Sequence, residues 1–151
     1  MARRAGKTSA AAYLAALDVH RAQVIGRWDA TTGIEPFEKL VDMVMNQEPY
    51  TSARRVFWIV DNGSSHRGKA ACDRIQQRWS NAILVHTPVH ASWLNQIEIY
   101  FSILQRKVLS PNDFQALDAL ERMILAFQER FSKLARPSLG ASLAMTCIAG
   151  D

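Results

Sequence analysis

The chain has 151 residues, of which 48% are hydrophobic and 21% are charged. This composition is typical of one globular domain and excludes disordered, collagen-like and low-complexity chains. Lys and Arg outnumber Asp and Glu by 18 to 14, and the net charge of +4 mildly favours a polyanionic partner. The two cysteines form no CxxC motif, which argues against a zinc site or a disulfide framework. The N-terminal apolar stretch is broken by Asp18 and is too short to cross a membrane, so we expect a cytoplasmic protein without a membrane partner.

Four elements are expected in the first part of the chain. Two short apolar runs, residues 11–17 and 24–28, flank a polar turn and predict an antiparallel hairpin. Residues 35–46 carry apolar side chains at steps of three and four, which predicts an amphipathic helix. Residues 56–60 are consecutive apolar residues of β-branched and aromatic types, as in the interior strand of a parallel or mixed sheet.

The second part of the chain continues with alternating elements. Residues 67–79 predict a helix, and residues 82–85 predict a second short strand. Apolar stripes at helical spacing then indicate helices over residues 93–108 and 117–134. Residues 135–151 have small side chains without a periodic stripe, so we expect a domain over 1–134 followed by a poorly ordered tail.

Asp61 directly follows the predicted interior strand. In open α/β sheets, ligands gather at the carboxyl ends of the strands, so Asp61 is a candidate metal ligand. The Asp-Asn-Gly string that begins here is also a favoured turn sequence, in which the carboxylate binds a backbone amide. Position alone does not decide between the two interpretations.

Glu98 lies at the edge of the apolar stripe in the predicted helix over 93–108, with Asn95 about one turn earlier. Such a carboxylate either borders a cleft or is a solvated flanking charge. An Asp at a strand end and a Glu on a helix together suit a hard divalent cation such as Mg²⁺, which binds carboxylate oxygens.

Two strings carry a more specific signal than either acid alone. Residues 60–66 read Val-Asp-Asn-Gly-Ser-Ser-His, and residues 87–98 read Thr-Pro-Val-His-Ala-Ser-Trp-Leu-Asn-Gln-Ile-Glu. They resemble the second and third acidic motifs of the DDE transposases of bacterial insertion sequences, in the mariner-like superfamily. Asp61 and Glu98 are 37 positions apart, close to the spacing that the resemblance implies.

The resemblance implies a ribonuclease-H-like fold whose mixed sheet is flanked by helices and carries three acids. These acids bind two Mg²⁺ or Mn²⁺ ions for DNA cleavage and strand transfer, with transposon ends and target DNA as partners. By position, Asp61 matches the second acid and Glu98 the third. Asn62, His66 and Asn95 match residues that support and orient them. For His66, a polar residue that opens a helix is an equally good interpretation.

The chain also departs from this pattern. Its opening hairpin resembles the second and third strands of the fold, so the strand with the first acid would precede Met1. Asp18 lies in the hairpin turn, where aspartates are usually structural. We therefore expect a truncated catalytic domain that lacks its first strand and is inactive alone. The tail after Pro137 lacks the expected aromatic and hydroxyl-rich residues, and a shifted reading frame is one hypothesis for it.

Basic residues are a weaker signal for DNA binding. Lys and Arg supply most non-specific DNA affinity, and Arg106 and Lys107, downstream of Glu98, are the best candidates. Arg54, Arg55 and the other cations are equally explained as solvated surface. The alternative to a transposase fragment is a non-catalytic module that binds nucleic acid or associates with itself or with full-length transposase.

Overall fold

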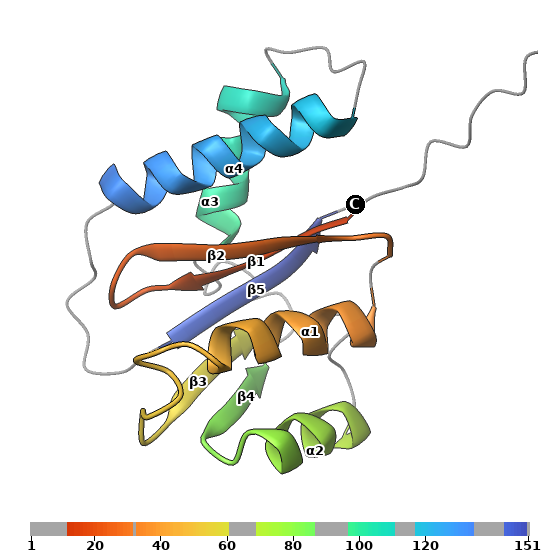
Figure 1. Ribbon diagram of the computed structural model, residues 1–151, viewed down its shortest axis with the longest axis vertical. Helices are drawn as coiled ribbons and strands as arrows, with labels where there is room; N and C mark the ends of the chain where they lie inside the picture. The colour runs from red at the N-terminus through yellow and green to blue at the C-terminus, as the bar shows by residue number, and fades with distance from the viewer. Residues whose placement is uncertain are drawn as a thin grey trace, which may run out of the picture.

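The computed structural model describes residues 12–31, 33–60, 69–86, 97–110, 117–134 and 144–150, with only the backbone described at 69, 98, 117 and 144–150. Its elements in chain order are β1 (Ala12–Asp18), β2 (Gln23–Asp29), α1 (Ile34–Met45), β3 (Val56–Val60), α2 (Lys69–Arg78), β4 (Ala82–His86), α3 (Ile97–Leu104), the π-helix η2 (Gln105–Leu109), α4 (Leu117–Leu134) and β5 (Ala144–Gly150). The strands form one sheet in the order β2-β1-β5-β3-β4. Helices α1 and α2 cover one face, and α3 and α4 cover the other (Figure 1). The mixed α/β class is confirmed and is consistent with a ribonuclease-H-like fold.

The expected hairpin is β1 and β2, which pair antiparallel from Ala12 and Asp29 to Asp18 and Gln23. All seven residues of β1 are buried, because the strand lies inside the sheet between β2 and β5. Asp18 ends β1, and its Oδ1 accepts the backbone N–H groups of His20 at 2.9 Å and Arg21 at 3.0 Å. This carboxylate therefore shapes the turn, as expected of a turn aspartate.

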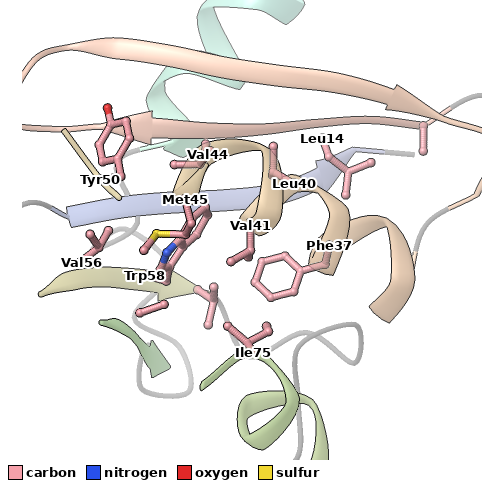
Figure 2. Close-up of a cluster of buried hydrophobic side chains, with 14 residues drawn as sticks. Leu14, Phe37, Leu40, Val41, Val44, Met45, Tyr50, Val56, Trp58 and Ile75 are labelled. Carbon is pink, nitrogen blue, oxygen red and sulfur yellow. The ribbon is translucent and has the colours of Figure 1, made fainter. Parts of the chain in front are cut away.

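Helix α1 confirms the helix expected over residues 35–46 and builds the core on its face of the sheet. Its apolar side chains point at the strands in Figure 2, and five of them are at most 2% exposed: Phe37, Leu40, Val41, Val44 and Met45. Trp58 of β3 is fully buried beneath α1, and its ring meets Phe37 edge-on with centroids 6.3 Å apart. Helix α2 is tied to α1 because Asp42 accepts a 2.7 Å hydrogen bond from the Trp79 indole and pairs with Arg78.

Strands β3 and β4 confirm the two strands expected at 56–60 and 82–85. They pair parallel, with Val56 beside Ala82 and Val60 beside His86. Helix α2 provides the crossover that two parallel neighbours require. Strand β3 is interior, as expected, because β5 pairs with its other edge.

The core on the opposite face joins β1 to α3, η2 and α4. Ile97, Tyr100 and Leu104 anchor α3 there, each at most 2% exposed. The stripe expected for this helix included Ile97, Phe101 and Leu104 but not Tyr100. The Tyr100 hydroxyl is paired with that of Tyr13 at 3.1 Å, so the ring can be buried. Burial raises the pKa of Tyr100 to about 12. Of the helix expected over 93–108, residues 93–96 lie outside the described residues, and the turn after Leu104 is π-helical.

Strand β5 lies in the segment after residue 134 that was expected to be a tail. Residues 144–150 form the central strand of the sheet. Strand β5 runs antiparallel to β1 and parallel to β3, with Cys147 opposite Ala16 on one side and beside Val60 on the other. The sheet extends beyond the expected boundary at residue 134.

Candidate functional site

The predicted site belongs to the edge at which the parallel strands end. Strands β3, β4 and β5 run in the same direction, so their carboxyl ends meet at one edge of the sheet. Val60 is the last residue of β3, and Asp61 follows it directly. Asp61, Asn62 and His66 lie in the segment 61–68, outside the described residues.

Glu98 is the second residue of α3. The flanking Ile97 and the nearby Tyr100 are both fully buried against the sheet, which holds this turn of the helix on the face of β1 that carries Tyr13, Ala15 and Leu17. The side chain of Glu98 and the whole of Asn95 lie outside the described part of the chain.

Three other charged residues, Asp18, Arg54 and Arg55, lie at the opposite edge of the sheet. Asp18 ends β1, which runs antiparallel to β5, so it lies opposite Met145 near the amino end of β5. It is fully buried and receives a 2.6 Å hydrogen bond from the Tyr50 hydroxyl. Arg54 and Arg55 precede β3 and are exposed at the same far edge. None of these residues is near the carboxyl end of β3.

His86 reaches the same edge and was not singled out from the sequence. It ends β4, is partly exposed, and lies beside Val60 in the parallel register. Because residues in register share a face, His86 lies on the α1 and α2 face with Val60, while α3 covers the other face. The sequence signal for it is only that it follows the apolar run of β4.

Arg106 and Lys107 are exposed on η2, directly after α3. The Arg106 guanidinium donates a 3.3 Å hydrogen bond to the Ser102 carbonyl, and buried Val108 fixes the same turn against the core. Lys107 and Arg130 both line a largely apolar groove of about 440 Å³ between η2 and α4. The expected pair of cations is therefore presented on the surface, on the same side of the sheet as α3.

Within the described ranges, no three His, Cys, Asp or Glu side chains lie close enough together to hold a metal ion. The side chains of both predicted ligands, Asp61 and Glu98, lie outside those ranges. In the same ranges, no helix has the length and apolar character needed to cross a lipid bilayer.

Residues 2–121 match the family model described as DDE superfamily endonuclease. The match covers most of the chain and includes the sequence positions of both candidate acids. The chain belongs to the DDE superfamily of endonucleases. Neither the curated proteins nor the solved structures gave a match. Membership implies a transposase-like nuclease that acts on DNA, and DDE endonucleases generally use divalent metal ions.

The range of the family match also bears on the sheet. Strands β1 to β4 and helices α1 to α3 lie within residues 2–121, whereas β5 lies beyond them. The central strand of this DDE domain is therefore supplied by a segment outside the family match. No apolar periodicity in the sequence indicated that role.

Proposed function

We propose that the chain is a fragment of the catalytic domain of an insertion-sequence transposase of the mariner-like superfamily, located in the bacterial cytoplasm. The chemistry of the parent transposase would be metal-dependent cleavage and strand transfer at transposon ends and target DNA. The observation that carries this proposal is the family match over residues 2–121, which spans Asp61 and Glu98 at their expected spacing.

The arrangement of strand and helix supports a shared site for these two acids. Asp61 directly follows Val60, the last residue of the interior strand β3. Glu98 is the second residue of α3, which covers the face of the sheet opposite α1.

The donor set fits a hard divalent cation, because Mg²⁺ and Mn²⁺ both prefer carboxylate oxygens. Asp61 and Glu98 would hold the metal, while Asn62, His66 and Asn95 would orient these ligands or the substrate. Bound in pairs, such ions stabilise the attacking and leaving oxygens of an in-line displacement at a phosphodiester. Arg106 and Lys107 would bind DNA phosphates on the same side of the sheet.

The resemblance implies three acids, and Asp61 and Glu98 account for two. The strand beside β3, which is β5, has the sequence Ala-Met-Thr-Cys-Ile-Ala-Gly and contains no carboxylate. Two carboxylates are too few to hold two metal ions in the positions that an in-line attack requires. We therefore propose that the chain is inactive as a nuclease by itself.

The same strand favours a second candidate function. A complete sheet with an incomplete set of acids suits a non-catalytic module that binds nucleic acid, or that associates with itself or with full-length transposase. This candidate needs the fold and the basic surface around Arg106 and Lys107, but neither acid.

A Mg²⁺ titration of the purified chain, followed by heteronuclear NMR, tests the proposed site. Asp61→Asn and Glu98→Gln remove the two charges, and Asp118→Asn is the matched control because Asp118 is an exposed carboxylate on α4. We expect saturable shifts at both acids that either site variant abolishes and the control retains. A folded chain without such shifts contradicts the metal site, and binding of labelled DNA by that chain would then support the non-catalytic module.

A further inference from the structure

The groove between η2 and α4 is separate from the proposed metal site. It has a volume of about 440 Å³ and is lined mostly by apolar side chains. Its two walls belong to the layer of helices on the face of the sheet opposite α1 and α2 (Figure 1). Ligand pockets commonly have volumes of about 300–1,000 Å³. The groove is therefore large enough to take several side chains of a partner.

The floor of the groove is apolar and firmly packed. Phe127 and Val108 line it, are 8% and 5% exposed, and belong to one buried cluster. The ring of Tyr100 lies against those of Phe127 and Phe131, with centroid distances of 5.7 and 5.0 Å. Contacts with α3 therefore hold both groove-lining rings in place. A floor that is already ordered lowers the entropic cost of binding a partner.

The lining is elongated along α4. Its α4 residues recur at steps of three and four from Met123 to Leu134, so the lining extends over about 16 Å of the helix. Met123 and Leu134, at the two ends, are 41% and 75% exposed. Contiguous exposed apolar side chains mark interaction sites. A stripe with helical spacing suits an amphipathic helix, whose own apolar residues recur at the same steps.

The sides of the groove are cationic. Lys107 of η2 and Arg130 of α4 line it, and no Asp or Glu is among its described lining residues. Both cations are exposed, and neither forms an ion pair with a described residue. By contrast, Lys133 on the same helix is paired with Glu129 at 2.7 Å. An apolar floor beside two such cations is complementary to an apolar stripe flanked by carboxylates.

We propose that this groove binds an acidic amphipathic helix of a partner protein. The apolar stripe of that helix packs on the floor, and its Glu or Asp side chains pair with Lys107 and Arg130. Duplex DNA is also anionic, but its phosphate backbone has no apolar stripe to cover the floor. A helix of about 11 residues spans the lining. The proposal goes beyond the nuclease function and does not depend on it, because it involves neither Asp61 nor Glu98.

Binding of designed peptides to the full-length chain tests the proposal. The probe is a fluorescein-labelled peptide of about 15 residues with Leu at steps of three and four and Glu or Ala at the other positions. Fluorescence anisotropy measures its affinity. A second peptide has Lys in place of each Glu, and a third has the composition of the first in an order without a stripe. We expect the Glu peptide to bind about tenfold more tightly than either control peptide.

Two matched pairs of variants locate the binding site on α4. Arg130→Gln removes a groove cation, whereas Arg122→Gln removes an exposed cation of the same helix that does not line the groove. Met123→Gln and Leu125→Gln replace apolar residues that are 41% and 44% exposed, of which only Met123 lines the groove. We expect Arg130→Gln to weaken binding about threefold and Met123→Gln about fivefold, with little change in the two controls. Circular dichroism checks that each variant is folded.

Several results would overturn the proposal. No binding to a folded chain, or equal binding of either control peptide, would show that the groove does not select an acidic amphipathic helix. Equal losses in the groove and control variants would place the peptide elsewhere on the surface. DNA binding weakened by both Arg130→Gln and Met123→Gln would assign the groove to DNA, and self-association abolished only by Met123→Gln would assign it to a second copy. None of these readouts involves the metal titration, so either proposal can fail without the other.

Discussion

The hydrogen bond between Tyr50 and Asp18 allows a sharp test of what stabilises the hairpin end of the sheet. The Tyr50 hydroxyl donates to Asp18 Oδ2 at 2.6 Å, and the exposed fractions of the two residues are 1% and 0%. Tyr50→Phe keeps the ring in the core and removes this donor, together with the hydrogen bond between the same hydroxyl and the exposed Arg21 side chain. A hydrogen bond to a charged group contributes about 1.5–3 kcal/mol, so we expect the free energy of unfolding to fall by that amount.

For a domain of this size, each kcal/mol lowers Tm by about 2–4 °C, so the expected decrease is roughly 3–12 °C. Urea unfolding followed by circular dichroism gives the free energy, and an unchanged m-value shows that the unfolded state is not altered. Tyr100→Phe is the matched control, because it deletes the same atom from a buried ring whose 3.1 Å partner is the neutral Tyr13 hydroxyl. The free energy of unfolding of Tyr100→Phe should fall by only about 0.5–1.5 kcal/mol.

Charge dependence is tested by combining Tyr50→Phe with Asp18→Asn. Tyr50→Phe should lower the free energy of unfolding by less when position 18 is Asn than when it is Asp, because the acceptor is then neutral. A loss in Tyr50→Phe no larger than that in Tyr100→Phe would refute the reasoning, since it would mean that water or another donor replaces the tyrosine.

Three further predictions concern other parts of the molecule. Burial raises the pKa of the Tyr100 hydroxyl from 10.0 to about 12. The stabilisation by the protonated hydroxyl is therefore complete below pH 10 and is lost as the pH rises toward 12. The free energy of unfolding should fall across that range, and it should fall less steeply in Tyr100→Phe. A Cβ at Gly26 would lie 2.5 Å from the Tyr13 hydroxyl, so Gly26→Ala should lower the unfolding free energy by about 1–3 kcal/mol in urea titrations, and an unchanged midpoint would contradict this contact. Arg106→Ala and Lys107→Ala should each weaken binding to duplex DNA of any sequence and reduce the salt slope by about 0.9; a slope that does not change would exclude that side chain from phosphate contact.

Most of the fold was predictable because apolar periodicity determines which faces must be buried. The steps of three and four in α1 place Phe37, Leu40 and Val44 on the core side, where they are found. The β-branched run of β3 likewise indicated an interior strand. In both cases the local pattern and the tertiary contacts agree, so the sequence alone was sufficient.

Strand β5 was not predictable, because its position depends on two distant edges rather than on its own side chains. Cys147 lies opposite Ala16 and beside Val60, residues that are far away in the chain. Tyr100 was missed for a related reason, since its burial depends on the hydroxyl of Tyr13. In the candidate site, the register of β3 and β4 places His86 at the edge where β3 ends, but on the face of the sheet away from α3. Spacing along the sequence cannot show on which face a residue lies when the pairing of the strands is unknown.

The central place of β5 also affects the order of folding. A ribosome makes β5 after every other described element, so the hairpin and the β3–β4 pair must wait, unjoined, until translation has passed residue 150. Contacts between residues so far apart raise the contact order and slow folding. During that interval the inner edges of β1 and β3 have no partner, and unpaired strand edges promote aggregation. The nascent chain is therefore expected to depend on chaperones until its last strand is made.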